Sequence, residues 1–452
     1  MQFKKKKLDI FESAKPKLEK IIDKNHKLIK LSKLIDWESL EKTFLKYYHP
    51  SYGRPGKSVR LMVGLHFLKY MYDLSDEEIV ERWLENPYWQ YFTGEERFQY
   101  KLPIHPTSMT KWRNRIKEED LLKLLEETVK SGFKSGYLKG LDVKRVNVDT
   151  TVQEKNISYP RDIRLYYKLI EHLVKYAKSL GLKLKQTYLN VGKKLLKAYG
   201  GYIHAKQYRR ARGSVKKMKT NMGRLYREIK RKLSEALKSS EEFEHLSNLC
   251  EKLSNQSKNS KNKIYSIHEP EVVCISKGKQ HKKYEFGNKV GIVTSSRKNF
   301  ILSCLSFKGN PYDGHTLKEN LLSAEKTVKE LGYKVEEAAV DLGYRGHDYE
   351  GDVKVNVVKR NLKGLKLSFK KFLKRRSAIE AGISHLKRDS RLDRNYLKGT
   401  KGDKLNAVLS ACGYNLRLIL AFVYFFLYLN WKILDKNTEN FIKLSKRQIR
   451  FV

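Results

Sequence analysis

The sequence predicts a mixed α/β protein in which helices cover a mixed β-sheet, and further helical segments precede and interrupt that sheet. Three observations support this prediction. Residues 145–152 alternate apolar and polar side chains, as a strand does. Residues 36–140 and 161–261 have the apolar periodicity of helices. Residues 271–390 contain several strand patterns, a helix, two strands and a helix, an order that suits a mixed sheet covered by helices.

The composition favours a globular fold and a nucleic-acid partner. The chain has 452 residues, of which 40% are hydrophobic, enough for two or three domains with a sizeable core. Its 95 Lys and Arg exceed its 50 Asp and Glu and leave a formal net charge of +45. Basic side chains that face phosphates release condensed counterions, whereas a membrane surface would also require an exposed apolar face. A lysine-rich proteome, as in a thermophile or an AT-rich genome, is the alternative explanation.

Cysteine spacing and apolar runs indicate a cytoplasmic protein with no membrane partner. The four cysteines lie far apart and form no C-x-x-C pair, so neither a zinc ribbon nor a disulfide framework is expected. The basic N-terminus lacks the apolar stretch of a secretory signal. The longest apolar run, Leu418–Leu429, is too short to span a bilayer and predicts a buried helix.

The first helical segment, residues 36–140, is expected to follow a basic arm formed by residues 1–35. A helix begins at Ser58, and the apolar residues after it are spaced for one buried face. The next helix opens with Ser75 and Glu78, which match a capping box in which each side chain satisfies the other residue's backbone N–H. These signals predict an all-helical N-terminal domain.

A basic helix is predicted at residues 106–115, after a turn-rich segment. The arrangement is typical of a helix-turn-helix reader, in which the later helix enters the major groove of DNA. Lys111, Arg113 and Arg115 are therefore candidate DNA contacts. The alternative is a solvated basic face on an ordinary helix bundle.

The second helical segment, residues 161–261, is predicted to be an insertion within the sheet domain. Two apolar stripes, which begin at Ile163 and Met218, predict two long amphipathic helices packed as a hairpin. Basic residues far outnumber acidic ones here, so the outer face is a candidate surface for DNA phosphates. A plain solvated coiled coil is the alternative.

Three acidic residues occupy places where a strand end or a helix face would expose a carboxylate. Asp149 lies late in the first strand, Asp341 ends a later strand, and Glu380 faces outward from a helix. Ligands of open sheets gather beyond the carboxyl ends of strands, so the two aspartates are candidates for one site. Hard oxygen ligands suit Mg²⁺. Two such ions would activate a water or a 3′-OH and stabilise the leaving oxygen of an in-line displacement.

The helix of Glu380 also carries two cations on nearly the same face. Arg376, Glu380 and Lys387 fit the spacing R-x3-E-x6-K, which places them at helical positions i, i+4 and i+11. A carboxylate between two cations can hold a metal while the cations contact phosphates near the cut. A surface ladder of ion pairs would have the same spacing and is the alternative.

Several segments, taken in order, resemble those of DDE transposases from bacterial insertion sequences. The resemblance covers about residues 36–430, and its motifs are Val146–Val152, Gly309–His315, Asp341–Gly346 and Arg376 through Glu380 to Lys387. It implies an RNase H-like catalytic core in residues 141–160 and 262–430. It also implies that Asp149, Asp341 and Glu380 bind metal, and that Arg376 and Lys387 hold DNA.

The activity implied by the resemblance is cutting and joining of DNA with two Mg²⁺ or Mn²⁺ ions. Such an enzyme binds the terminal inverted repeats of its element, hydrolyses a phosphodiester at each end and joins the 3′-OH to target DNA. Because two ends must be joined, a homodimer or higher assembly on DNA is expected, at the bacterial nucleoid. An RNase H-like nuclease without joining activity and a catalytically inactive DNA-binding derivative are the alternatives.

Two further expectations concern the motif and the C-terminus. Families with the full Y-R-E-K signature carry a tyrosine three residues before the arginine, whereas this chain has Leu373 there, beside Phe372. The resemblance therefore does not extend to the stacking or phosphate contact of that tyrosine. Residues 431–452 form a basic tail, and its segment Lys443–Arg450 is a further candidate DNA contact.

Overall fold

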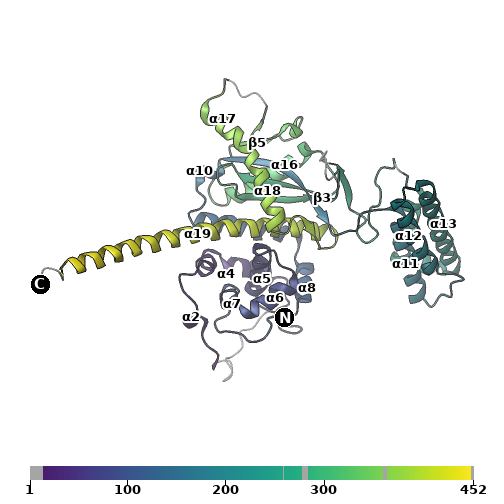
Figure 1. The fold of residues 1–452 in the computed structure, drawn as a ribbon, viewed down its shortest axis with the longest axis horizontal. Coiled ribbons are helices and arrows are strands. Elements are labelled where there is room, and N and C mark those ends of the chain that lie inside the picture. The colour runs from purple at the N-terminus through teal and green to yellow at the C-terminus, as the bar shows by residue number, and fades with distance from the viewer. Residues whose placement is uncertain (1–13, 258, 277–282, 360–363, 449–452) are drawn as a thin grey trace. The chain divides into compact units, whose positions relative to one another are not determined.

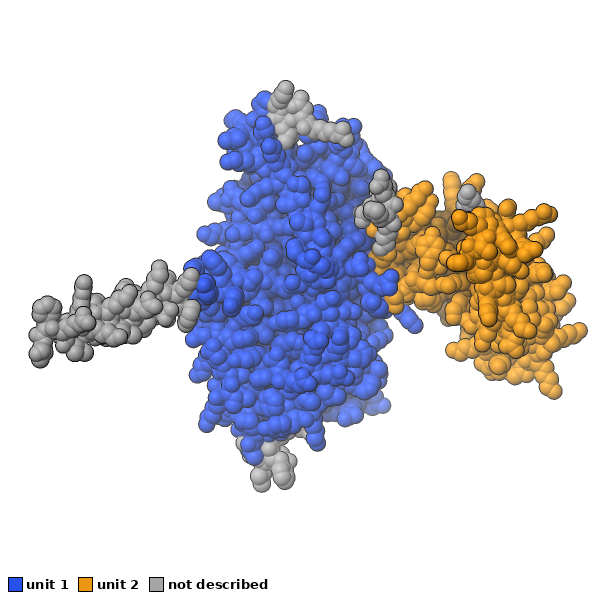
Figure 2. Space-filling view, viewed as in Figure 1, with its two compact units in different colours: residues 1–153, 289–307, 311–452 blue, residues 154–288, 308–310 orange. Residues whose placement is uncertain are grey.

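The computed structural model describes residues 14–257, 259–276, 283–359 and 364–448, and the chain divides into two compact units. Figure 2 distinguishes them by colour, with residues 1–153, 289–307 and 311–452 in blue and residues 154–288 and 308–310 in orange. The first unit contains the N-terminal helices, most of the sheet and the C-terminal helices. The second unit is mainly helical.

The N-terminal part of the first unit is all-helical. Its helices are α2 (Leu18–Ile21), α3 (Lys27–Leu34), α4 (Trp37–Leu45), α5 (Val59–Met71), α6 (Asp76–Glu85), α7 (Pro87–Phe92), α8 (Thr107–Arg115), α9 (Glu118–Lys134) and α10 (Gly140–Val143). Ser58 caps α5 by accepting from the N–H of Leu61, and the capping box of Ser75 and Glu78 opens α6 as predicted. Every residue of α5 except Arg60 is buried, so α5 lacks the single buried face expected from the sequence.

The first helices also differ from the basic arm expected for residues 1–35. Residues 1–13 lie outside the described residues, but α3 carries the buried side chains Leu28 and Leu31 in the main core of the first unit. Leu18 of α2 is also fully buried. Apolar residues at helical spacing therefore anchor this stretch in the domain, and they outweigh its basic composition.

The sheet of the RNase H-like core is mixed and contains seven strands in the described residues. The strands are β1 (Arg145–Lys155), β2 (Val273–Ser276), β3 (Tyr284–Ser295), β4 (Ile301–Phe307), β5 (Glu337–Val340), β6 (Lys354–Val357) and β7 (Arg394–Asn395). Their order is β2-β3-β1-β5-β6, with β4 beside β3 and β7 beside β1. β1–β5 and β5–β6 are parallel, whereas β2–β3 and β3–β4 are antiparallel. The prediction of a mixed α/β fold with an N-terminal helical region is confirmed.

β1 is longer than the sequence pattern indicated. The alternation predicted an end near Thr151 or Val152, but the strand continues to Lys155. The polar side chain of Gln153 is fully buried, and its Oε1 accepts a hydrogen bond of 2.9 Å from Nδ2 of Asn406. A partner far away in the sequence thus allows a polar residue to remain inside the sheet.

Helices on both sides of the sheet position the acidic residues. They are α16 (Asp313–Lys329), α17 (Leu367–Lys374), α18 (Ala378–Asp389) and α19 (Gly399–Gln448), with the short 3₁₀ helices η1 (Leu342–Tyr344) and η2 (Arg375–Ser377). α16 packs on β4, and α19 packs on β4, α9 and α5. In Figure 1, α19 runs between the N-terminal helices and the sheet.

The apolar run in α19 is only partly buried. Leu420 is 8% exposed, but Tyr424, Phe425 and Phe426 are 57%, 55% and 48% exposed, so the expected buried helix ends early. The helical segment Gly399–Leu429 is long and apolar enough to cross a membrane by length and composition, and 39% of its apolar window is buried. Because the first half of α19 packs against α5, α9 and β4, it serves as a core helix of the first unit.

The second unit is a bundle with its own apolar core. Its helices are α11 (Asp162–Ser179), α12 (Leu189–His204), α13 (Tyr208–Lys232), α14 (Glu235–Lys238) and α15 (Glu241–Asn255). The two predicted stripes are buried, as Ile170 of α11 and Met222 of α13 illustrate. α12 and α15 pack against the α11–α13 pair, so the predicted hairpin is part of a larger bundle.

Candidate active site

The parallel strands β1 and β5 lead to Asp149 and Asp341. β1 and β5 are parallel neighbours, and Asn147 pairs with Ala339. This is the last pair of the two strands, and Asp149 and Asp341 each follow it by two residues, Asp149 within β1 and Asp341 directly after β5. Neighbouring strands lie about 4.8 Å apart, so the two carboxylates start from adjacent backbone positions.

The face of β1 that carries Asp149 points toward η2 and α18. Side chains two residues apart on a strand share a face. Nδ2 of Asn147 donates a hydrogen bond of 3.2 Å to the backbone oxygen of Arg375, in η2. Asp149 is on the same face, which brings it beneath the start of the helix that holds Glu380.

Arg376 joins two of the three predicted acids. Its Nη1 lies 3.3 Å from Oδ2 of Asp149, and its Nη2 lies 2.5 Å from Oε1 of Glu380. The side chains of Arg376 and Asp149 are 15% and 17% exposed, whereas that of Glu380 is 61% exposed. Both sides of the guanidinium fork are therefore directed to carboxylates in this structure. Its predicted role in holding DNA stays a prediction.

Asp341 is held by the turn that follows β5. Its Oδ1 accepts a hydrogen bond of 2.9 Å from the backbone N–H of Gly343, which caps η1. A Cβ on Gly343 would lie 3.0 Å from Oδ1 of Asp341 and 3.4 Å from Oδ2 of Asp313. The glycine therefore leaves a narrow space that two carboxylates approach from different sides.

Asp313 is a residue whose place in this site the sequence did not reveal. Its Oδ1 accepts hydrogen bonds of 2.8 Å from Oγ1 of Thr150 and 2.8 Å from Nζ of Lys289. In the sequence it stands in a Gly-Asn-Pro-Tyr-Asp turn, and turn chemistry accounts for such a residue adequately. Asp313 follows β4 and is the first residue of α16, and its hydrogen bond with Thr150 joins it to β1 next to Asp149.

The donor set fits a hard divalent cation, although its carboxylates are not gathered around one point. Within the described ranges, no group of three or more His, Cys, Asp or Glu side chains is arranged to hold a metal ion. Arg376 lies between Asp149 and Glu380 and supplies positive charge there. Carboxylate oxygens with room left for water and phosphate are the ligands that Mg²⁺ and Mn²⁺ prefer.

Lys387 lies two turns beyond Glu380 in α18. This spacing of seven residues keeps the two side chains on nearly the same face of the helix, as predicted. Its side chain is half-buried. A contact between Lys387 and DNA stays a prediction.

The residue in place of the signature tyrosine has a packing role. Leu373 is 5% exposed and belongs to a small apolar cluster with Ala339 of β5 and Phe372. The guanidinium carbon of Arg145 lies 5.0 Å from the centre of the Phe372 ring. α17 is thus fixed to the same sheet face as Asp149, with its apolar side chains directed inward.

One of the three predicted DNA contacts in α8 is buried, and we correct that prediction. Nη1 of Arg113 donates a hydrogen bond of 2.9 Å to Oδ1 of Asp76, and its Nη2 donates one of 2.5 Å to Oδ2 of the same carboxylate. Arg113 is 6% exposed because it lies next to Trp112 on the inner face of α8. Lys111 and Arg115 are exposed and remain candidates.

Arg113 lies among other titratable groups that are largely buried. Burial lowers the pKa of His66 to about 3 and that of Lys69 to about 8. Burial alone would raise the pKa of Asp76, but hydrogen bonds and positive charge from Arg113 and Lys69 hold it well below its usual range. Arg113 and Lys69 therefore share the carboxylate of Asp76 inside the domain.

The connection before α8 also differs from a typical helix-turn-helix. Residues 93–106 separate α7 from α8, whereas the motif usually has a turn of three or four residues. α5 and α6 are joined by a connection of that shorter kind, residues 72–75. The exposed cations of α8 are therefore presented by a different local arrangement from the one expected.

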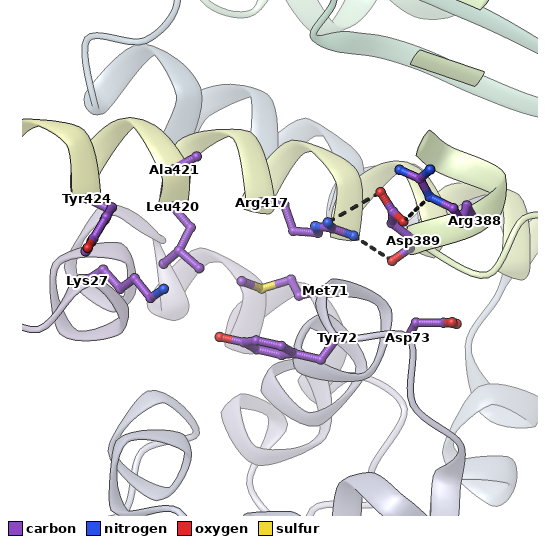
Figure 3. A pocket seen from close by; sticks show the side chains of 10 residues that line it. All are labelled: Lys27, Met71, Tyr72, Asp73, Arg388, Asp389, Arg417, Leu420, Ala421 and Tyr424. Atoms are coloured by element: carbon purple, nitrogen blue, oxygen red, sulfur yellow. Dashed lines mark hydrogen bonds and ion pairs between the residues drawn. The ribbon is translucent and has the colours of Figure 1, made fainter. Parts of the chain in front are cut away.

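A hollow of about 600 Å³ lies apart from the predicted acids. Figure 3 shows the residues that line it: Lys27, Met71, Tyr72, Asp73, Arg388, Asp389, Arg417, Leu420, Ala421 and Tyr424. Arg417 donates a hydrogen bond of 2.9 Å to the backbone oxygen of Asp389, and Nε of Arg388 donates 2.9 Å to Oδ1 of the same residue. None of the three predicted acids lines it, so the candidate active site is at the strand ends.

Comparisons with known proteins concern both parts of the chain. The family model "Transposase domain (DUF772)" matches residues 16–115, and the model "Transposase DDE domain" matches residues 272–416. The chain is 44% identical over 202 residues to the "Uncharacterized protein ORF8 in nfe locus" of Rhizobium meliloti. That alignment covers 45% of this chain and 96% of the relative. No solved structure matches the chain.

Proposed function

Because the chain belongs to the DDE transposases of bacterial insertion sequences, we propose that it cuts its own element from DNA and inserts it elsewhere. It binds the terminal inverted repeats, hydrolyses a phosphodiester at each end and joins the freed 3′-OH to target DNA. The observation that supports this most strongly is that Arg376 contacts both Asp149 and Glu380, beside the parallel strands β1 and β5 that lead to Asp149 and Asp341.

Asp149, Asp341 and Glu380 are the residues that would hold two Mg²⁺ or Mn²⁺ ions. When bound, such ions activate the attacking water or 3′-OH and stabilise the leaving oxygen. Asp341 is oriented by the Gly343 N–H, and Asp149 and Glu380 are kept together by Arg376. The mechanism requires no nucleophilic side chain, in contrast to the mechanisms of serine and tyrosine recombinases.

The cations around these acids provide the DNA contacts. Lys387 lies on the Glu380 face of α18, where an ammonium group can neutralise a phosphate next to the cut. Arg376 is the second cation of this face. Lys111 and Arg115 of α8 contact the duplex farther from the cut, as sequence readers or as phosphate contacts.

The helical insertion contributes a separate phosphate-binding surface, which we call the cationic groove. It is a hollow of about 620 Å³ lined by Lys185, Gln186, Tyr188, Arg224, Arg227, Glu228, Arg231 and Lys232. Arg224, Arg227 and Arg231 are exposed and follow one face of α13. Glu228 is its one acidic lining residue and pairs with Lys232 at 2.6 Å. The excess positive charge suits a DNA backbone.

The enzyme works as a homodimer or higher assembly on DNA, at the bacterial nucleoid. Two element ends must be brought together before joining, which one copy per end achieves with the same site twice. The family acts on DNA, and a chain with a formal net charge of +45 is attracted to it.

The test uses the element's own ends. A supercoiled plasmid that carries the gene with its flanking DNA is incubated with the full chain, Mg²⁺ and a second plasmid as target. We expect free 3′-OH ends and joined products. Asp149→Asn, Asp341→Asn and Glu380→Gln each abolish both, because a metal ligand is lost while DNA binding remains.

A matched control and the two alternatives complete this test. Asp352→Asn removes a carboxylate that is 76% exposed and paired with Lys334, so it leaves activity unchanged. Cutting without joined products would identify a nuclease. DNA binding without metal-dependent nicking would identify an inactive derivative. Either result would refute the proposed transposition.

A further inference from the structure

A fourth carboxylate, that of Asp313, approaches the space bordered by Asp341. The hydrogen bonds from Thr150 and Lys289 both end on its Oδ1. Its Oδ2 makes no hydrogen bond in the described part of the chain and lies 3.4 Å from the position of a Gly343 Cβ. One oxygen of Asp313 is therefore fixed by partners, while the other is directed toward the turn that holds Asp341.

Lys289 fixes the orientation of this carboxylate. Its side chain is 9% exposed, and its Nζ also donates a hydrogen bond of 2.6 Å to the backbone oxygen of Pro311. A buried ammonium requires a charged or strongly polar partner, and Asp313 is that partner. The pair spans from β3 to the first residue of α16, so both ends are anchored in regular structure.

A buried hydroxyl beside the acids lacks a partner. Tyr344 is fully buried, and its Oη has no partner within normal hydrogen-bond distance among the described residues. The hydroxyl of Thr316 is near enough to lower the pKa of Tyr344 but donates to the backbone oxygen of Asp313. Burial raises the pKa of Tyr344 well above the usual value, and the negative charges of Asp149, Asp313 and Asp341 raise it further. Buried polar groups are nearly always paired. This donor is therefore placed to bind an oxygen that arrives with a ligand.

We propose that Asp313 is a fourth carboxylate ligand of the divalent-ion site, acting through Oδ2 beside Asp341 while Lys289 holds Oδ1. The hydroxyl of Tyr344 donates to a ligand oxygen of the loaded site. This inference rests on the proposed function, since it assumes that Asp341 binds a divalent ion. The inference adds Asp313 to the three proposed metal ligands, because Asp313 and Asp341 both lie close to Gly343.

The experiment is a titration of the full chain with Mn²⁺ in the absence of DNA, followed by the electron paramagnetic resonance of free Mn²⁺. Asp313→Asn keeps an oxygen for Thr150 and Lys289 but removes the charge of a direct ligand. It should therefore weaken Mn²⁺ binding at least as much as the loss of a hydrogen-bond partner of a metal ligand does, which is about 10- to 100-fold. Asp341→Asn should weaken it at least as much. Asp352→Asn, at an exposed carboxylate, should leave it unchanged.

The variant Lys289→Met distinguishes two roles of Asp313, that of an ion ligand and that of a partner needed only to neutralise Lys289. If Asp313 binds the ion, Thr150 still holds its Oδ1 after the lysine is removed, and the site carries more negative charge, so Mn²⁺ affinity is retained or rises. If Asp313 serves only to pair with Lys289, both variants disturb the same packing and both weaken binding. Thermal unfolding of each variant verifies that the fold is kept.

The outcomes distinguish this inference from the function on which it rests. Weaker binding in Asp341→Asn with unchanged binding in Asp313→Asn would overturn the inference alone. Equal loss in Asp313→Asn and Lys289→Met would also overturn it. Wild-type chain that binds no Mn²⁺, or Asp341→Asn with wild-type affinity, would overturn both the inference and the proposed metal site.

Discussion

Gly343→Ala tests the geometry of the candidate site more sharply than the loss of a carboxylate does. The new Cβ would lie 3.0 Å from Oδ1 of Asp341 and 3.4 Å from Oδ2 of Asp313, and the first distance is shorter than ordinary van der Waals contact. The backbone at Gly343 is outside the left-handed region, so alanine fits there without backbone strain. The substitution therefore acts by displacing the carboxylate of Asp341 by a few tenths of an ångström.

The substitution should lower the rate of cleavage but should not lower the stability of the fold. A misplacement of about 1 Å can cost about 100-fold in rate, so a displacement of a few tenths should slow cleavage by about 10-fold. Gly to Ala in a compatible backbone usually stabilises a protein by about 0.4–1 kcal/mol through the unfolded chain. We therefore expect slower cleavage with a free energy of unfolding that is unchanged or slightly raised.

The assay is single-turnover cleavage of end DNA, with thermal unfolding of the same preparation. Gly213→Ala is the matched control, because a Cβ there meets nothing within 4 Å and the residue lies inside α13. The control should keep the wild-type rate. Wild-type cleavage by Gly343→Ala, or a loss of stability that explains its slower rate, would refute the reasoning.

Three further predictions follow from the contacts of other residues. Arg113→Ala should lower the free energy of unfolding by about 3 kcal/mol or more, because it breaks a buried ion pair, and should leave the DNA affinity of the folded protein unchanged in a binding assay. Replacing Arg224, Arg227 and Arg231 with Ala should reduce the slope of log K against log salt by about 3, measured by fluorescence anisotropy; an unchanged slope would exclude the cationic groove as a DNA contact. Tyr344→Phe should leave the ion-free melting temperature unchanged or higher and should reduce the rise that Mn²⁺ produces, whereas a lower ion-free value would show that the hydroxyl is already paired.

The sequence predicted the features that depend on local chemistry. The capping box of Ser75 and Glu78 follows from two residues one helical turn apart, and the structure contains it. The alternation around Asp149 predicted β1, and the stripe that includes Met218 predicted α13. A short-range pattern contains all the information that such elements require.

The sequence could not predict contacts that join distant segments. Arg113 and Lys111 are equally basic in the sequence, and only the packing of α8 against Asp76 separates a buried ion pair from an exposed cation. Asp313 looked like a turn residue because its partner Lys289 lies on β3, more than twenty residues earlier in the chain. The helix spacing placed Arg376 beside Glu380, but it gave no sign that the same guanidinium also contacts Asp149.

The apolar run of α19 illustrates a third cause of error. The run Leu418–Leu429 has the composition of a buried helix, yet its side chains are buried only while α19 remains in contact with the other elements of the first unit. Composition alone does not specify where those neighbouring elements end. Together with the preceding turns of the helix, the same run is apolar and long enough to cross a membrane by length and composition.

The most direct test of the central claim is the anomalous scattering of Mn²⁺ in crystals of the chain bound to element-end DNA. We expect manganese peaks in contact with the carboxylates of Asp149 and Asp341 and within reach of Glu380, next to the 3′ end of the DNA. Peaks at other residues, or a DNA-bound state in which these carboxylates share no ion, would contradict it.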